Sequence, residues 1–293
     1  MSAGFGAGFD TRFPAPAKIN RFLHITGRRA DGYHELQTVF QFLGLADRLW
    51  FEPLAAGRFE MAAAAAIDGE DNLCVRAARA LAAAAGVSFG VRIHLDKRIP
   101  VGGGLGGGSS DAAATLVALN HLFELELALP ELVRLGLSLG ADVPVFVAGR
   151  AAWAEGVGER LTPVAPDTGW VLLIDPGVSV ATGPLFGARE LTRDCPPETI
   201  SPEIDSARFG NVFEPVVRRR YPEVARAHDW LAGQTDRARL SGSGGCVFGM
   251  FPDEAAAARA QARQPERWRS WVTPLTNASP LTAWLPQPEP AGI

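Results

Sequence analysis

The stretch KRIPVGGGLGGGSSDAAA, residues 97–114, decides the fold of this chain. Six of the seven residues in 102–108 are glycine, and six missing side chains indicate that another group comes close to the backbone. Ser109 and Ser110 follow as candidate N-caps, and an apolar, alanine-rich run with helical spacing continues to Leu122. The unpaired N–H groups and positive dipole of a helix N-terminus therefore face the loop, which predicts an anion site, most naturally for phosphate.

Three other interpretations of the loop fit less well. A flexible linker would not stand between the amphipathic strand-like residues 91–95 and a capped helix. A P-loop requires a lysine directly after its glycines, and none follows here. Gly102, Gly104 and Gly107 satisfy the dinucleotide pattern G-x-G-x-x-G, but a poly-glycine run does so by chance and Pro100 interrupts the preceding strand.

Composition limits the classes of function. The 293 residues allow one large or two ordinary domains, at roughly 150 residues per domain. A net charge of -4 offers no electrostatic footprint for nucleic acid or an anionic membrane. The cysteines Cys74, Cys195 and Cys246 are too widely spaced to predict a disulfide framework or a zinc site. Without a membrane-span run or a signal-peptide pattern, the sequence predicts a cytoplasmic protein that binds a small ligand, not nucleic acid or membrane.

Lysine is scarce in this chain. Among 28 basic residues only Lys18 and Lys97 are lysine, and all the others are arginine. Lysine is a compact point charge that reaches into a tight site, whereas arginine is a broad planar fork. Lys97 heads the glycine loop and Lys18 lies in the first apolar segment, so both are candidate site residues.

After a disordered leader, periodicity predicts a first half with strands first and helices between them, which indicates an α+β layer and not strict βαβ alternation. Residues 16–26 form a strand with Lys18, Asn20 and His24 on one face and Ile19 and Leu23 on the other. The turn signal Asp31-Gly32 then presents Tyr33 and His34. Further strands are expected over residues 35–43, 47–53, 58–62 and 91–95, and helices over 73–85, 111–122 and 130–139.

The second half predicts another α+β unit. A second glycine loop, SGSGG at residues 241–245, lies between two of its strands. Residues 192–210 are expected to form a long loop, a turn or helix starts at Thr182, and the tail after Ala278 is expected to fray. Strands are expected over residues 170–174, 238–240, 246–251 and 268–275, and helices over 222–231 and 254–263.

Several candidate residues have an ordinary structural interpretation. Asn72 precedes a helical run and is favoured as its N-cap. Asp142 stands two residues before Pro144, which is also typical of an N-cap, although an aspartate can act as a general base. Tyr33 is equally consistent with packing at a strand edge and with a ligand contact.

The order of three motifs resembles that of the GHMP kinases, a family of small-molecule kinases. The motifs are PAKIN at residues 16–20, the glycine–serine loop, and LSGSGGCVFG at 240–249. GRRADGYHELQTVFQFL at 27–43, DNL at 71–73 and GADVPVF at 140–146 narrow the resemblance to members whose substrate carries a cytidyl diphosphate. The resemblance implies a two-domain α+β fold, with a ribosomal protein S5 domain 2-like half (1–163) and a ferredoxin-like half (164–293).

The resemblance also implies the chemistry of the site. ATP, with Mg²⁺, would phosphorylate an alcohol of the cytidyl diphosphate substrate, and no metal ligand can be assigned. The catalytic pair falls on Lys18 and Asp142. The substrate-binding positions are Asn20, Tyr33, His34, Thr182 and Phe186, of which Tyr33, His34 and Phe186 form a slot for cytosine. The ATP-binding positions are Asn72, Lys97, Pro100, Val101, Gly102, Gly103, Gly104, Leu105, Gly106, Gly107, Gly108, Ser109 and Ser110.

Some features stay open at this point. Arg21 stands where an apolar residue is more usual, which suggests a wetter strand, and Asp111 adds a negative charge that either helps to hold magnesium or only caps the helix. Another GHMP kinase, acting on homoserine, mevalonate or a sugar, and an RNA-binding module are the alternatives to the main hypothesis. We expect a monomer or a weak homodimer.

Overall fold

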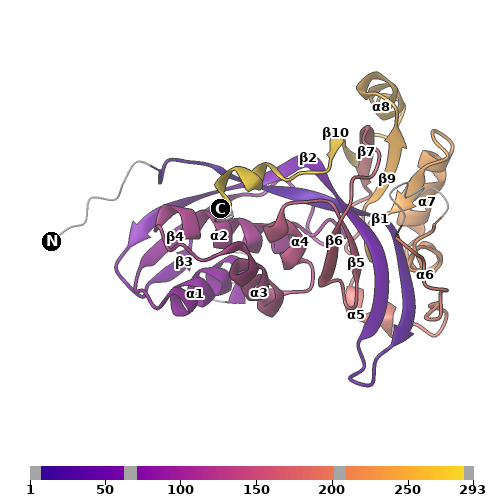
Figure 1. Cartoon of the computed structure of the whole chain (residues 1–293). Coiled ribbons are helices and arrows are strands. Elements are labelled where there is room, and N and C mark those ends of the chain that lie inside the picture. Colours follow the sequence, from indigo (N-terminus) through magenta and orange to yellow (C-terminus); the bar gives the residue numbers. More distant parts are fainter. Residues whose placement is uncertain (1–7, 63–70, 201–208, 287–293) are drawn as a thin grey trace, which may run out of the picture.

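The centre of the molecule is one mixed sheet of ten strands (Figure 1). The computed structural model describes residues 8–62, 71–200 and 209–286. The main path through the sheet is β3-β4-β2-β10-β7-β9-β8. Off this path, β1 and β5 pair with β2, and β6 pairs with β5. The predicted α+β class is confirmed. The strands are β1 (Phe13–Arg28), β2 (His34–Leu54), β3 (Phe59–Met61), β4 (Gly90–Asp96), β5 (Ala152–Glu155), β6 (Arg160–Pro163), β7 (Trp170–Asp175), β8 (Ala238–Leu240), β9 (Val247–Phe251) and β10 (Arg269–Thr276).

Helices cover the sheet in two groups. In Figure 1, α1 to α4 lie together below the long strands β1 and β2, and α6 to α8 lie at the other end. None of the helices in the described ranges has the length and apolar character that crossing a bilayer requires. The helices are α1 (Leu73–Ala85), α2 (Gly107–Leu122), α3 (Leu129–Leu139), α4 (Val143–Ala148), α5 (Thr182–Phe186), α6 (Glu214–Arg220), α7 (Pro222–Ala232), α8 (Glu254–Gln261) and the 3₁₀ helix η4 (Pro280–Trp284).

The start of α2 differs from the prediction. The N-cap is Gly106, in the left-handed region at φ 69°, and the helix begins at Gly107. Ser109 and Ser110 therefore lie inside the first turn and are not caps. Ser110 is buried and its hydroxyl donates to the carbonyl of Pro16 at 2.7 Å, so it ties the helix to β1. By contrast, α1 has the predicted bounds, with Asn72 as N-cap.

β2 is one strand of 21 residues, so the prediction of separate strands over 35–43 and 47–53 is wrong. The glycine between them, Gly44, does not form a turn. A Cβ at Gly44 would lie 2.8 Å from the ring of Pro274, so the glycine lets β10 pass close to β2. There β10 pairs with β2 at Phe42 and Leu43 and joins the two halves of the sheet.

β1 contains a bulge that changes the predicted faces. Its register with β2 shifts between Asn20 and Leu23. After this shift Leu23 lines the same cavity as Lys18 and Asn20, whereas His24 packs edge-on against the ring of Phe22 at 5.2 Å. The prediction that His24 shares a face with Lys18 and Asn20 is therefore wrong, because an inserted residue reverses the alternation.

Both ends of the described chain are more ordered than expected. Phe13 is fully buried in β1, so the leader ends before it. In the tail, η4 buries Leu281 and packs Trp284 against Phe13, with ring centroids 5.1 Å apart. Fraying after Ala278 is therefore wrong up to residue 286, because the tail completes the core of the first half. Residues 287–293 lie outside the described residues.

Each half of the chain contributes residues to the hydrophobic core of the other half. Leu23 and Ile25 of β1 belong to the core of the second half, and Leu281 belongs to that of the first. Residues 192–200 form the start of the predicted long loop, and the amide of Cys195 donates to the carbonyl of Ile25 at 2.9 Å. The later part of that loop, 201–208, lies outside the described residues. The boundary between residues 163 and 164 stays a prediction.

Candidate active site

Two glycine loops interlock at the centre of the candidate site. The carbonyl of Gly104 accepts a hydrogen bond from the Ser241 hydroxyl at 3.0 Å, and the amide of Cys246 donates to Gly103 at 3.1 Å. Gly104 has φ 75°, and a Cβ there would lie 2.1 Å from the carbonyl oxygen of Ser241. Only glycine fits at this contact. The second loop, from the far half of the chain, therefore holds the first in place.

The first cavity lies at the N-terminus of α2 and has a volume of about 380 Å³. The amide of Ser110 makes the bond to Gly106 that starts the helix, so the amides of Gly107, Gly108 and Ser109 are those that a helix N-terminus leaves for an anion. Every predicted ATP-binding residue lines this cavity except Ser110, which is buried behind it. The predicted residues that line it are Asn72, Lys97, Pro100, Val101, Gly102, Gly103, Gly104, Leu105, Gly106, Gly107, Gly108 and Ser109.

Asn72 both caps α1 and lines the first cavity. Its side-chain oxygen accepts a hydrogen bond from the amide of Cys74 at 2.8 Å, which caps α1 and confirms the capping interpretation. The same residue borders the first cavity. Its capping bond uses one side-chain atom and fixes where the rest of the amide lies.

Lys97 is held between two carboxylates beside this cavity. Its ammonium lies 2.6 Å from Oδ2 of Asp47 and 2.7 Å from Oδ2 of Asp111. Burial alone would lower the pKa of Lys97, but the charges of Asp111 and Asp47 outweigh it and raise that pKa. Burial, with the nearby charge of Asp47, raises the pKa of Asp111 to about 7 although Lys97 opposes the change. Asp47 was not predicted as the partner of Lys97, because it lies 50 positions away in the sequence.

Asp111 does not cap α2, because the N-cap is Gly106 and Asp111 lies inside the helix, so the capping alternative for Asp111 is wrong. Its other oxygen, Oδ1, is buried and has no hydrogen-bond partner among the residues that the structure describes. Asp111 lines the first cavity. A buried carboxylate oxygen without a partner is costly unless a ligand satisfies it.

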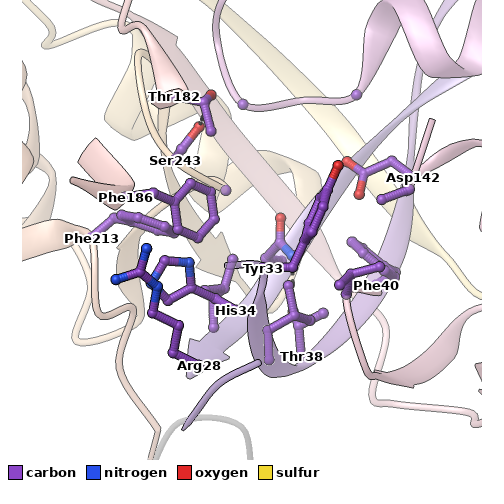
Figure 2. Close-up of a pocket in the computed structure, with 18 of the residues that line it drawn as sticks. Arg28, Tyr33, His34, Thr38, Phe40, Asp142, Thr182, Phe186, Phe213 and Ser243 are labelled. Atoms are coloured by element: carbon purple, nitrogen blue, oxygen red, sulfur yellow. Dashed lines mark hydrogen bonds between the residues drawn. The ribbon is translucent and has the colours of Figure 1, made fainter. Parts of the chain in front are cut away.

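The second cavity has a volume of about 750 Å³ and is shown in Figure 2. It brings together residues from the hairpin β1–β2, the loop before α4, α5 and both glycine loops. Gly104 and Gly106 line this cavity as well as the first, so the two cavities border the same loop. All the predicted catalytic and substrate-binding residues line it: Lys18, Asn20, Tyr33, His34, Asp142, Thr182 and Phe186.

Lys18 and Asp142 form an ion pair where the two cavities meet. The Lys18 ammonium lies 3.4 Å from Oδ2 of Asp142 and donates to the carbonyl of Gly104 at 3.2 Å. The Lys18 side chain is 4% exposed and that of Asp142 is 35% exposed, so a ligand can reach the carboxylate. Asp142 occupies the N-cap position of α4 but makes no side-chain capping bond there. The capping interpretation of its side chain is therefore wrong.

A chain of hydrogen bonds orients Lys18. Its ammonium donates to Oδ1 of Asn20 at 2.6 Å, and the Asn20 amide nitrogen donates to the Thr38 hydroxyl at 2.9 Å. The Thr38 hydroxyl in turn donates to the carbonyl of Phe22. An ammonium can only donate a hydrogen bond, so the side-chain oxygen of Asn20, and not its nitrogen, faces Lys18. Thr38 fixes this series of hydrogen bonds. It was not predicted, because a threonine in a strand has no distinguishing local pattern.

Three rings, those of His34, Phe186 and Phe213, form one wall of the second cavity, the aromatic wall. His34 stacks on Phe186 with ring centroids 5.0 Å apart and planes 25° apart, and Phe213 meets Phe186 edge-on at 4.9 Å. Tyr33, which is 65% exposed, stands apart from this pair at the tip of the hairpin (Figure 2). The Asp31-Gly32 turn that presents it is as predicted, with the amide of Tyr33 donating to Asp31 at 3.1 Å. A flat ring could enter between Tyr33 and the stacked pair.

Thr182 bridges to the second glycine loop. Its hydroxyl lies 2.6 Å from that of Ser243, and Figure 2 shows the two side chains meeting at the edge of the cavity. Either hydroxyl can be the donor, so the pair can offer one O–H and free lone pairs to a ligand. Ser243 was not singled out in the sequence, although it lies within the SGSGG loop.

Arg21 does not lie in a wet part of β1, as its charge suggested. It is 2% exposed and donates to Oε1 of Gln41 at 3.0 Å and to the carbonyl of Asp167 at 2.8 Å. It also pairs with the Asp167 carboxylate. Arg21 is therefore a structural residue that joins β1 and β2 to the segment before β7.

Known proteins are similar to this chain over most of its length. Models of the GHMP kinase N-terminal and C-terminal domains match residues 72–150 and 198–270. The chain is 55% identical over 273 residues to 4-diphosphocytidyl-2-C-methyl-D-erythritol kinase of Halorhodospira halophila, covering 92% of this chain and 94% of that one. It is 51% identical to the protein of the same name from Nitrosococcus oceani, covering 92% and 96%.

Solved structures show the same fold. A crystal structure of 4-(cytidine 5'-diphospho)-2C-methyl-D-erythritol kinase has a TM-score of 0.76 and 38% identity, covering 90% of this chain and 99% of that one. The mevalonate kinase of Methanococcus jannaschii has a TM-score of 0.67 at 15% identity, covering 93% and 100%. The second likeness concerns the fold alone.

Proposed function

This chain belongs to the GHMP kinase family, and from that membership we propose that it transfers the γ-phosphate of ATP to the 2-hydroxyl of 4-diphosphocytidyl-2-C-methyl-D-erythritol. This reaction is a step of the non-mevalonate route to isoprenoid precursors. The names of the relatives described above support the substrate. The observation that carries the proposal is the Lys18–Asp142 pair at the loop that borders both cavities.

The proposed mechanism assigns one cavity to each substrate. ATP occupies the cavity at the N-terminus of α2, where backbone amides of residues 107–109 bind its phosphates. The alcohol occupies the larger cavity, with its hydroxyl at Asp142. Phosphoryl transfer needs positioning and charge stabilisation from the protein, and one group that takes the proton of the attacking hydroxyl. Asp142 is that general base.

Lys18 is proposed to stabilise the negative charge that develops on the attacking and transferred oxygens. Its ammonium is buried and already fixed by Asn20 and Gly104, so little rearrangement is needed when the charge develops. The same contacts hold it beside Asp142. A positive charge at this point serves both the deprotonation and the transfer.

The aromatic wall is proposed to bind cytosine far from the reacting hydroxyl. Tyr33 on one side and Phe186 on the other would stack on the flat base, and His34 would add a hydrogen bond. Asn20, which contacts Lys18, and Thr182, which contacts Ser243, also line this cavity and would contact the rest of the substrate. Binding energy gained at the base would hold the hydroxyl near Asp142.

Mg²⁺ fits the residues of the first cavity. Magnesium is usually bound by one or two carboxylates together with phosphate oxygens and water. Within the described ranges there is no cluster of three or more His, Cys, Asp or Glu that could hold a metal. The buried Oδ1 of Asp111, which has no hydrogen-bond partner there, is a carboxylate oxygen that could serve. Asp111 would hold Mg²⁺ together with ATP, and the ion would supply positive charge that offsets the charge of the phosphates.

Asp111→Asn is expected to reduce the benefit of Mg²⁺ for ATP binding. Without the charge of Asp111, metal-free ATP is repelled less, so the ATP Kd measured without Mg²⁺ should fall. The same change weakens a Mg²⁺ ligand, so the ATP Kd measured with Mg²⁺ should rise. The ratio of the first Kd to the second should therefore fall about tenfold. Calorimetric titration of ATP in EDTA and in Mg²⁺ measures both constants. Asp71→Asn is the matched control, because Asp71 lines the same cavity but is exposed. An unchanged ratio in Asp111→Asn would exclude Asp111 as a ligand.

The proposed function is tested by offering the protein ATP with different alcohols. We expect ADP formation with 4-diphosphocytidyl-2-C-methyl-D-erythritol, and at least about 10³-fold lower kcat/KM with homoserine, mevalonate and galactose, because these lack a base for the aromatic wall. Turnover only with one of those three would reject the assignment. RNA binding without ATP turnover would revive the remaining alternative. A cytoplasmic location and a monomer or weak homodimer remain parts of the proposal.

A further inference from the structure

Arg193 uses its whole guanidinium to hold the aromatic wall together. It lies in the segment after α5 and is partly buried. Its Nη2 donates to the carbonyls of Phe186 at 2.8 Å and Ala188 at 2.6 Å, and its Nη1 donates to that of Leu191 at 3.0 Å. Its Nε donates to Nε2 of His34 at 3.3 Å. One side chain thus joins the end of α5 to the start of β2.

The contact with Arg193 decides which nitrogen of His34 carries hydrogen. A guanidinium can only donate, so Nε2 of His34 must be the unprotonated, accepting nitrogen. The hydrogen of the neutral ring then lies on Nδ1. His34 is therefore a neutral ring with one donor, stacked on Phe186 at the wall of the substrate cavity.

The charges around His34 favour the same state. Burial is the main cause that lowers the pKa of His34, and the positive charges of Arg193 and Arg28 lower it further. Arg28 comes from β1, opposite His34 in the strand register, and Figure 2 shows it beside the His34 ring. Both arginines disfavour the imidazolium.

We propose that Arg193 is a positioning residue for substrate specificity, which fixes His34 as the neutral Nδ1–H tautomer and fixes Phe186 beneath it. The pair then offers a flat face and a single donor, which suit an uncharged pyrimidine base with an acceptor on its edge. This inference rests on the proposed function for the identity of the base. The arrangement of Arg193 and His34 themselves does not depend on it.

Arg193→Gln tests the proposal, because glutamine cannot reach His34 and three carbonyls together. We expect the KM for the cytidyl substrate to rise about tenfold, the loss of roughly one hydrogen bond, while the KM for ATP stays within about twofold. Nitrogen-15 NMR of His34 is the second readout. In the wild type it should show hydrogen on Nδ1 only, and in Arg193→Gln the pKa of His34 should rise toward its ordinary value of about 6.5.

Arg189→Gln is the matched control. Arg189 is exposed, four positions earlier in the same segment, and should leave both KM values and the His34 spectrum unchanged. Hydrogen on Nε2 in the wild type, or an unchanged cytidyl KM in a folded Arg193→Gln protein, would overturn the proposal. If Arg193→Gln does not fold, the wild-type spectrum alone decides. Failure of the proposed function is recognised separately, as a wild type that does not turn over the cytidyl substrate.

Discussion

Asp142→Asn is expected to bind ATP as the wild type does and to lose at least about 10²-fold in kcat. Asparagine has the same shape as aspartate but cannot take the proton of the attacking hydroxyl. Since ATP is proposed to occupy the other cavity, its Kd should change little. The Asp142 side chain makes no capping bond to α4, so the helix does not depend on its charge.

Turnover under saturating substrates and calorimetric binding of ATP separate these two effects. Asp194→Asn, at an exposed position, is the control for loss of one negative charge. A kcat within about fivefold of the wild type would show that Asp142 is not the general base. A large loss of ATP affinity would instead indicate that the carboxylate orders the glycine loop.

Lys18→Arg is expected to lose about 10²- to 10³-fold in kcat despite keeping the charge. The ammonium fits between Oδ1 of Asn20 at 2.6 Å and the carbonyl of Gly104 at 3.2 Å. The end of the side chain also lies close to the loop, because a Cβ on Gly106 would lie 3.1 Å from Cε of Lys18. A guanidinium is wider and flat, so it would displace the loop that lines both cavities.

Comparison with Lys18→Met separates charge from shape. Methionine removes the charge but keeps an unbranched chain that the pocket can hold. If the narrow pocket matters as proposed, Lys18→Arg should be about as inactive as Lys18→Met, while both variants remain folded. Near wild-type turnover in Lys18→Arg would show that any positive charge suffices at this position.

Local features of the structure were predictable from short stretches of sequence. Asn72 and Gly86 bound α1 as predicted, because a capping bond and a left-handed glycine act within one helical turn. The Asp31-Gly32 turn formed for the same reason. The start of α2 was the local error. Two serines suggested a cap, but Gly106 could take the left-handed conformation that begins the helix earlier.

The long-range pairs were outside the reach of these patterns. Family resemblance brought Lys18 and Asp142 together as a prediction, and the structure places their side chains 3.4 Å apart. Neither local pattern nor resemblance indicated that Asp47 would hold Lys97, or that Arg193 would reach His34 across 159 positions of sequence.

The sequence by itself determined the glycine loop ahead of α2, the α+β class and both ends of α1, because each follows from interactions between near neighbours. Only the tertiary structure decided that β2 continues through Gly44, that the tail returns to Phe13, and that Ser241 locks Gly104 from 137 positions away. These features depend on close packing between distant segments. Whether a position requires glycine, and whether a buried carbonyl is hydrogen-bonded, depends on the distant group that packs against it.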